Sequence, residues 1–548
     1  MNEPAAPDSP RSPRWPSAVL WLGLLATLVW CVLLRVPLIV NAQTHLDSDL
    51  AVDGLTLREA LQGHWRWHYP GTPHMGIGAA LLSWIPARIV GATPSALVGG
   101  GTLAYLLLVL GAFATAWRSF GPRVAGWCLV PLAFTSTGTI WLTGRITGGH
   151  MLAAAWSAGA WWLLALALEK GGRGRVFLLG LWCGLGMYHD SLFLMTLVGL
   201  VPAGLIFAVA SRWGDLRGAR DLARGLLLLA GFAVGFAPNA LGRWIDPYDA
   251  YNEQFAWSLE PELVREHSRI LFLDCLPRLV AGHRLPGLEA DPDPALLGSA
   301  APIRRAGERG AAAGWSAAGL TLLSLGLFAV SLAVLAARSW NGASTSARSV
   351  ALGLSITTAA TLAAFVVNKN IFNADNYRYL VLLLIPWSLG FGLAAEALAR
   401  RSTGGLTAAV GLALALSVLF TLDAATWYRR LGWVDDRLAV VRRPLDDPTL
   451  RWLDEHPEVD SFAAGYWDAY RLAFLAGRPL RGVPHPIYPN RFPEWSNDLP
   501  GGRPEILIAR PTPEDQMFLR KALDDGGRVL HRDRGMTIAT WPADDAPR

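Results

Sequence analysis

Apolar runs long enough to cross a membrane recur along the first 423 residues of the chain, with short polar turns between them. A bilayer core of about 30 Å needs roughly 20 apolar residues per helix, and the pattern predicts about eleven spans. We expect the spans at residues 17–40, 97–117, 124–142, 151–168, 176–187, 191–210, 225–241, 313–337, 350–367, 380–395 and 406–422. The sequence therefore predicts a polytopic α-helical membrane protein.

One further apolar run, residues 74–90, differs from the others because Pro86 interrupts it and Arg88 lies inside it. We expect a juxtamembrane or re-entrant helix there. All the basic short loops then lie on one side of the membrane, in agreement with the positive-inside rule. These loops are at residues 118–123, 170–175, 212–224, 338–348 and 400–401. The prediction is a multi-pass protein of the cytoplasmic (inner) membrane, with its amino terminus inside and its carboxyl terminus outside.

The membrane-spanning part is flanked by a polar head. Residues 1–16 are rich in proline and lack apolar periodicity, which predicts a disordered cytoplasmic tail. Residues 17–423 form the predicted transmembrane module, with external loops at 41–96 and 242–312. Within the second loop, residues 263–280 are amphipathic, and we expect them to lie on the bilayer and gate a substrate groove.

Residues 424–548 are polar and charged, unlike the module before them. Short β-like runs alternate there with helix-like runs, a pattern typical of an α/β unit. We expect a small extracytoplasmic α/β accessory domain. The strand-like runs are 461–465, 505–509, 528–531 and 536–541, and the helix-like runs are 468–476 and 512–525.

The composition also fits a membrane protein, since 52% of the residues are hydrophobic and 17% are charged. The net charge of +5 arises from arginines in short loops, where they orient helices, so it does not indicate a nucleic-acid partner. The four cysteines show no metal-binding spacing. We expect no metal among the site residues and no cofactor, with use of a divalent metal ion left open.

Four polar clusters fall on the external side in this topology, which predicts one shared cavity. They are residues 45–53, 145–150, 188–190 and 368–378. In the first cluster, Asp49 and Asp53 lie four residues apart on a helix expected at 50–62, with Asp47 as its cap. Such acids either form a site or simply cap the helix.

The other charged residues also have two interpretations. Arg378 stands at the outer mouth of a span, where a guanidinium could bind a phosphate with two hydrogen bonds or anchor the helix at the interface. His150, His189 and Asp190 belong either to the cavity or to hydrogen bonds inside the bundle.

Several short motifs, in their order along the chain, resemble one family. The loop 49–55 (Asp-Leu-Ala-Val-Asp-Gly-Leu), the turn 118–121 (Arg-Ser-Phe-Gly) and the pair Arg378-Tyr379 are similar to the GT-C class of glycosyltransferases that use lipid-linked sugars. This class includes protein O-mannosyltransferases, aminoarabinose transferases and bacterial oligosaccharyltransferases. Residues 465–471 (Gly-Tyr-Trp-Asp-Ala-Tyr-Arg) resemble the accessory domain of some bacterial relatives.

The chain departs from the family at two places. Leu50 stands where many relatives have a second acid, and His150 stands where an Asp often follows the third span. Both departures put the metal use of oligosaccharyltransferases in doubt for this chain.

The resemblance implies an inverting transferase that moves a sugar from a polyprenyl-phosphate donor to an acceptor hydroxyl at the external face. The leaving phosphate needs no acid, so one base suffices. The acceptor is a glycan, a lipid or a protein. The implied base is Asp49, with Asp47 second; the implied phosphate ligands are Arg378, Arg145, Asn376 and Tyr377; and the implied cavity includes His45, Asp53, His150, His189 and Asp190.

We expect this groove and its catalytic residues to lie entirely before residue 423. The alternative function is a transporter or flippase of lipid-linked saccharides, which would need polar residues through the depth of the membrane.

Overall fold

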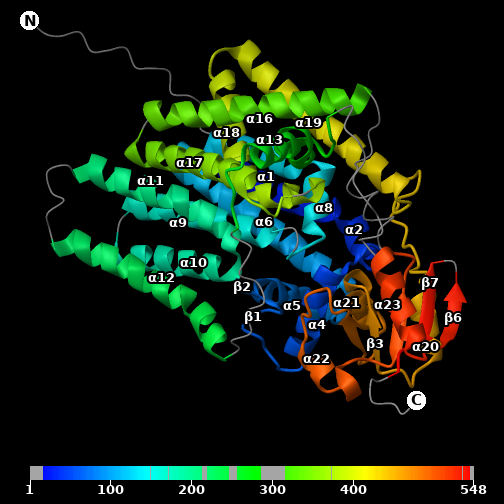
Figure 1. Ribbon diagram of the computed structural model, residues 1–548. Coiled ribbons are helices and arrows are strands. Elements are labelled where there is room, and N and C mark those ends of the chain that lie inside the picture. Colours follow the sequence, from blue (N-terminus) through cyan, green and yellow to red (C-terminus); the bar gives the residue numbers. More distant parts are fainter. Residues whose placement is uncertain are drawn as a thin grey trace, which may run out of the picture.

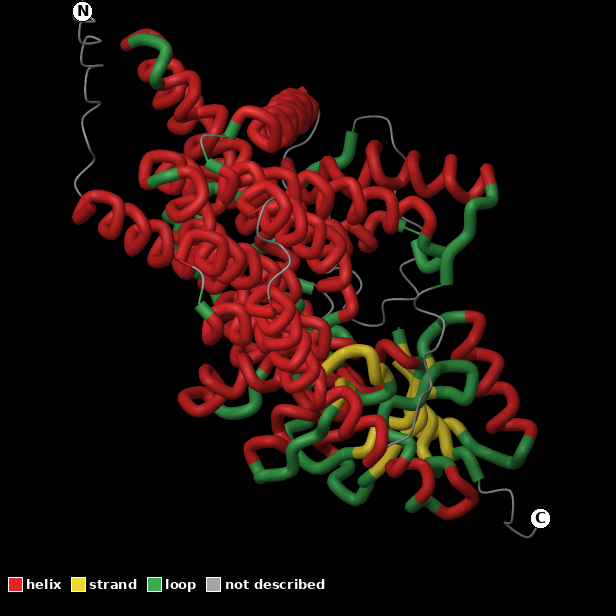
Figure 2. The backbone as a smooth tube through the Cα atoms, turned by 90° about the vertical axis from the view of Figure 1, so that its left-hand side faces the viewer, coloured by secondary structure: helices red, strands yellow, loops and turns green. Residues whose placement is uncertain are grey.

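The computed structural model describes residues 17–147, 150–170, 172–212, 219–245, 256–285, 315–342, 344–371, 373–533 and 535–542. The tail expected at 1–16 and much of the loop expected at 242–312 lie outside these residues. Long helices form the larger part of the protein, and a small sheet with its own helices packs against one end of them (Figure 1). Figure 2 shows the same separation from the side, with the strands gathered in one corner.

The helices follow the apolar runs. The long elements are α1 (Ser17–Leu33), α6 (Pro94–Phe120), α7 (Pro122–Ala133), α9 (Met151–Lys170), α10 (Arg173–His189), α11 (Leu194–Arg212), α12 (Ala219–Ile245), α16 (Trp315–Asn341), α17 (Thr345–Val367), α18 (Leu384–Ala399) and α19 (Thr403–Arg430). The shorter ones are α2 (Val36–Val40), α3 (Ala42–His45), α4 (Ser48–Leu61), α5 (Gly78–Val90), α8 (Thr137–Thr143), η1 (Ser191–Phe193), α13 (Pro261–Ile270), η3 (Leu271–Cys275), α14 (Leu276–Ala281) and η5 (Ala374–Leu383).

Among the described residues, eight helices are long and apolar enough to cross a membrane, or nine with one bent pair. The predicted polytopic helical class is confirmed, whereas the count of about eleven spans is not. The expected span at 124–142 is the bent pair, α7 and α8, which meet at 83°. Pro131 lies at the end of α7, and Ser136 caps α8 by accepting a hydrogen bond from the Thr139 amide. A proline and a new cap together end one helix and start another.

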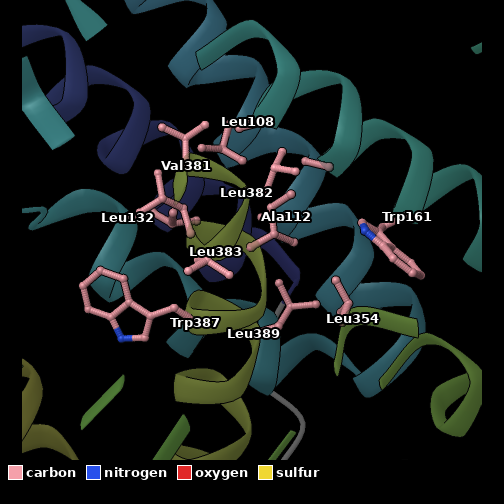
Figure 3. Packing of buried hydrophobic residues seen from close by; sticks show 14 of the residues in the cluster. Leu108, Ala112, Leu132, Trp161, Leu354, Val381, Leu382, Leu383, Trp387 and Leu389 are labelled. Carbon is pink, nitrogen blue, oxygen red and sulfur yellow. The ribbon is translucent and has the colours of Figure 1, made fainter. Parts of the chain in front are cut away.

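The core of the bundle surrounds η5 and α18. Figure 3 shows leucines of these two elements packed against Leu108 and Ala112 of α6 and near Trp161 of α9. Small residues let the backbones approach, as is usual between membrane helices. At Gly392 of α18 an added Cβ would lie 2.6 Å from the Val124 carbonyl oxygen of α7.

The segment expected to lie on the bilayer, residues 263–280, is largely inside the protein instead. Helix α13 has a broad exposed face, whereas α14 is buried and η3 exposes mainly Phe272. Arg278 is 1% exposed and pairs with Asp274 at 3.0 Å. A buried ion pair of this kind fixes the segment in place, so the expectation of a bilayer-surface helix over its whole length is wrong.

The carboxy-terminal part forms the predicted α/β unit. Its sheet has the order β4-β3-β5-β7-β6, with β3 parallel to β4 and β5, and with β7 antiparallel to β5 and β6. The strands are β3 (Ser461–Ala464), β4 (Arg481–Pro484), β5 (Ile506–Ala509), β6 (Val529–Asp533) and β7 (Met536–Thr540). The helices are α20 (Pro448–Glu455), α21 (Tyr466–Leu475), α22 (Glu494–Asn497), η6 (Pro500–Gly502) and α23 (Pro513–Asp524).

Helix α21 of this unit packs directly on the juxtamembrane helix α4. Phe474 lies against Gly54, where an added Cβ would be 2.5 Å from the ring, so the contact requires glycine. Arg58 donates to the Phe474 carbonyl at 2.8 Å. Two further strands, β1 (His68–Tyr69) and β2 (Thr72–Gly76), form a hairpin next in the chain. Helix α4 is therefore held between the bundle and the α/β unit.

Candidate active site

A cavity of about 530 Å³ lies where the bundle meets the α/β unit. The bundle side contributes residues from the ends of its helices and from the segments between them, and the α/β unit contributes five residues. The polar and aromatic lining residues are Asp49, Tyr69, Thr72, Thr147, His150, Asp190, Ser191, Trp257, Thr361, Phe365, Asn368, Asn370, Arg378, Tyr379, Tyr466, Trp467, Tyr488 and Arg491. Clusters that are distant in the sequence thus meet in one place.

Asp49 reaches this cavity because of how α4 begins. Asp47 is the N-cap and accepts a hydrogen bond from the Leu50 amide at 3.0 Å, which starts the helix at Ser48, earlier than expected. Asp49 then lies half-buried in the first turn. Its Oδ1 accepts a hydrogen bond from the Tyr466 hydroxyl at 2.7 Å, and its carbonyl accepts one from Tyr69 at 2.8 Å.

Asp47 has a different environment. Its Oδ2 accepts a hydrogen bond from Arg145 Nη2 at 2.7 Å, and both side chains are almost fully buried. Neither residue lines the cavity. This pair therefore joins the start of α4 to the segment after α8, and it leaves Arg145 neutralised rather than directed at a phosphate.

Arg378 of η5 lines the cavity. Its Nη2 donates to the Tyr379 hydroxyl at 3.4 Å, and the guanidinium lies 5.2 Å from the centre of that ring. Its Nε is buried and has no hydrogen-bond partner within the described part of the chain. The charge of Arg378 is near enough to interact with those of Asp375 and Asp49. The cavity therefore holds a cation and a carboxylate that are not joined to each other by a direct ion pair among the described residues.

Asn376 and Tyr377 are buried beside Arg378 and do not line the cavity. Asn376 completes the cap of η5 by accepting a hydrogen bond from the Asn373 amide at 3.1 Å. Tyr377 donates to the Gly138 carbonyl of α8 at 3.1 Å. Both residues thus hold η5 in the orientation that directs Arg378 to the cavity.

His150 and Asp190 face the cavity together. His150 Nδ1 and Asp190 Oδ2 are 2.7 Å apart, and the imidazole lies 5.1 Å from the ring of Tyr379. His150 has a positive φ of 51°, which is rare for a residue with a side chain and indicates a conformation fixed by its surroundings.

Asp53 lies behind this wall of the cavity. It is 2% exposed and accepts a hydrogen bond from Thr147, which does line the cavity. Burial raises the pKa of Asp53 to about 8.

The other two histidines predicted to belong to the cavity, His45 and His189, lie outside it. His45 packs among Trp141 and Trp433, and burial lowers its pKa to about 4. His189 stacks on Trp156 and borders a second, apolar cavity of about 520 Å³ between α1, α5, α6, α9 and α10. Neither residue lines the cavity that contains Asp49.

The α/β unit contributes residues that the sequence did not single out as site residues. Arg491 Nε donates to the Tyr466 hydroxyl at 3.1 Å, and its Nη1 donates to the carbonyls of Pro70 and Gly71. The motif at 465–471, which contains Tyr466, pointed to the carboxy-terminal domain of relatives. It did not indicate the hydrogen bond from Tyr466 to Asp49, which joins residues 417 positions apart. The expectation that the groove lies entirely before residue 423 is therefore wrong. No group of three or more His, Cys, Asp or Glu side chains able to hold a metal ion occurs among the described residues.

This fold, with its juxtamembrane helix and carboxy-terminal sheet, is that of the GT-C membrane glycosyltransferases, as the sequence motifs predicted. ArnT from Cupriavidus metallidurans is similar at TM-scores of 0.57 in the apo state and 0.56 bound to undecaprenyl phosphate, with 12% and 13% identity. Both matches cover 97% of this chain and 100% of ArnT.

The oligosaccharyltransferase AglB from Archaeoglobus fulgidus, in complex with an inhibitory peptide and a dolichol-phosphate, is similar at a TM-score of 0.50 and 12% identity. The match covers 97% of this chain and 75% of AglB. No protein-family model and no curated protein matches the sequence. At this level of identity the likeness establishes the fold, and the activity has to be argued from the site.

Proposed function

We propose that the protein is an inverting glycosyltransferase that moves a sugar from a polyprenyl-phosphate donor to an acceptor hydroxyl at the external face of the membrane. The observation that carries the proposal is one cavity lined by both Asp49 and Arg378. The fold it shares with ArnT, solved with undecaprenyl phosphate, and with AglB, solved with a dolichol-phosphate, supports the choice of donor.

Asp49 has the features of the base. Tyr466 occupies Oδ1, and no group within the described part of the chain donates to Oδ2. That oxygen can accept the proton of the acceptor hydroxyl as the acceptor oxygen attacks the anomeric carbon. The bond from that carbon to the phosphate oxygen breaks, and the electron pair leaves with the phosphate. A single displacement of this kind inverts the anomeric centre.

Arg378 has the features of the phosphate ligand. Its guanidinium lines the cavity without a paired carboxylate among the described residues, so it can offer its donors to the leaving phosphate. A fixed cation in a poorly hydrated site stabilises developing negative charge more than it would in water. His150, oriented by Asp190, adds a second donor on the same side of the cavity.

The test uses the purified full chain in lipid nanodiscs. Extracted lipid is first analysed by mass spectrometry, and undecaprenyl phosphate is then added while thermal unfolding is followed. We expect a copurified polyprenyl-phosphate sugar and a rise in unfolding temperature, because a ligand that binds only the folded state stabilises it. Arg378→Ala should abolish the rise, whereas Arg400→Ala, at the far end of α18 and paired with Glu396, should retain it.

A wild-type protein that carries no polyprenyl lipid and shows no rise would contradict the proposal. If the donor moves between the leaflets and is never consumed, the transporter alternative is correct instead.

A further inference from the structure

The contact between the α/β unit and Asp49 gives that unit a role in the chemistry. We infer that Tyr466 is a positioning residue that holds the Asp49 base through a hydrogen bond, and that Arg491 fixes Tyr466. The inference rests on the proposed function, because it assigns the use of a residue to the same site. It makes the α/β unit a part of the active site rather than an accessory.

The direction of the hydrogen bonds follows from the chemistry of the three groups. A guanidinium only donates and a carboxylate only accepts. The Tyr466 hydroxyl accepts from Arg491 Nε at 3.1 Å, so its own proton is available for Asp49 Oδ1 at 2.7 Å. The chain therefore runs from Arg491 through Tyr466 to Asp49. Successive donors of this kind polarise one another and strengthen the bond to the carboxylate.

The Arg491 end of this chain is anchored. Arg491 Nη1 donates to the carbonyl of Gly71 at 3.2 Å, in the hairpin that follows α4, and its amide donates to the Tyr470 hydroxyl at 2.6 Å. Gly71 has a φ of 69°, and an added Cβ would lie 3.0 Å from Arg491 Cδ. The turn is therefore shaped to receive this arginine.

Tyr466 stays a donor across the physiological pH range. Burial raises the pKa of its hydroxyl well above the ordinary value, and the neighbouring charge of Asp49 raises it further. Tyr466 is the first residue of α21, and α21 is held on α4 by the contact of Phe474 with Gly54. The donor is thus fixed by packing as well as by hydrogen bonds.

The consequence for Asp49 is geometric and electrostatic. With Oδ1 held by Tyr466, the free Oδ2 has a fixed direction within the cavity, as a base needs for efficient proton transfer. Loss of the donor would let the carboxyl group rotate. It would also remove a hydrogen bond to the charged form of the carboxylate, which favours that form.

The test is Tyr466→Phe, which keeps the ring and removes the hydroxyl. Hydrolysis of an undecaprenyl-phosphate-linked sugar, carrying the sugar found in the copurified lipid and with water as the acceptor, is measured against pH. We expect kcat to fall about 10- to 100-fold, as for loss of a hydrogen bond to a charged group, while KM for the donor stays nearly constant. The acid limb of the pH–rate profile should move to higher pH.

Two further variants sharpen the result. Tyr488→Phe removes a hydroxyl from the same wall of the cavity that has no hydrogen bond to Asp49, and its acid limb should stay in place. Arg491→Lys keeps the charge but loses the Nε donor, so its acid limb should move in the same direction as that of Tyr466→Phe and by less.

The outcomes separate the inference from the proposed function. If Asp49→Asn is inactive while Tyr466→Phe keeps the wild-type kcat and acid limb, the inference is overturned and the proposed base stands. If Tyr466→Phe loses folded protein and activity together with no movement of the limb, its role is only structural and the inference is also overturned. If Asp49→Asn turns over the donor normally, the proposed base itself is wrong.

Discussion

Two acid–arginine pairs at the start of α4 behave differently. Asp47 and Arg145 form a direct ion pair of 2.7 Å, and neither lines the cavity. Asp49 and Arg378 both line the cavity and are close enough for their charges to interact, but no ion pair joins them among the described residues. The first pair is an internal ion pair. The second pair is the one that we propose binds the ligand.

The difference follows from how α4 begins. Asp47 is the N-cap and has an extended backbone, with φ −112° and ψ 178°, whereas Asp49 lies in the first helical turn. Asp47 turns inward as the cap of α4 and Asp49 turns toward the cavity. Two acids that look equivalent in the sequence therefore have different surroundings, because one precedes the first turn of the helix and the other lies in it.

The largest expected effect is on catalysis. Asp49→Asn keeps the size of the side chain and can still accept from Tyr466, but it removes the base. Turnover of the lipid-linked donor should fall by about 10²- to 10⁴-fold, while the unfolding temperature stays close to that of the wild type. Donor consumption by mass spectrometry and thermal unfolding in detergent measure the two quantities. Normal turnover in this variant would show that Asp49 is not the base.

The counterpart of that experiment is Asp47→Asn. Asparagine still caps α4, so the main change is that Arg145 is left as an unpaired buried charge. The free energy of unfolding should fall by about 3–5 kcal/mol, with much less effect on the turnover of the protein that remains folded. Adding Arg145→Met to Asp47→Asn should restore much of the loss, because the buried charge is then gone. If the double variant is no more stable than Asp47→Asn, the ion pair does not have the structural role we assign to it.

The next effect concerns the donor phosphate. Arg378→Lys keeps the charge but loses the planar fork that binds a phosphate with two hydrogen bonds. Its affinity for undecaprenyl phosphate should fall about tenfold, and that of Arg378→Ala should fall more. Arg145→Lys is the matched control, because it changes the buried arginine and should leave donor affinity unchanged. Equal loss in both lysine variants would remove the distinction between the two pairs.

The long apolar runs were sufficient to predict the helical bundle, because each span in a bilayer needs such a run. It failed where a span is interrupted from within, as at Pro131 and the new cap at Ser136. The predicted strands at 461–465, 505–509, 528–531 and 536–541 correspond to β3, β5, β6 and β7. The strand β4 was not predicted, since its four residues, Arg-Gly-Val-Pro, contain two that usually weaken strands.

The candidate site was only partly predictable for a related reason. Charge and order along the chain drew attention to Asp49 and Arg378, which both line the cavity. The neutralisation of Arg145 by Asp47 and the contact of Tyr466 with Asp49 depend on tertiary packing between segments far apart in the sequence. No local pattern carries that information.

The smallest expected effect concerns Asp53, the second aspartate of α4. Its pKa of about 8 lies above the ordinary value near 4, so the folded protein keeps a proton that the unfolded chain releases. The free energy of unfolding should therefore decrease as the pH rises from about 4 to about 8, with no further loss from this group above that range. Asp53→Asn does not titrate and can still accept from Thr147, so it should remove this contribution.

The measurement compares unfolding temperatures at pH 5 and pH 8. The decrease between the two should be smaller in Asp53→Asn than in the wild type, by on the order of a few degrees. An equal decrease in both proteins would mean that Asp53 is already ionised behind the cavity, and that the acids of α4 differ in position without differing in charge.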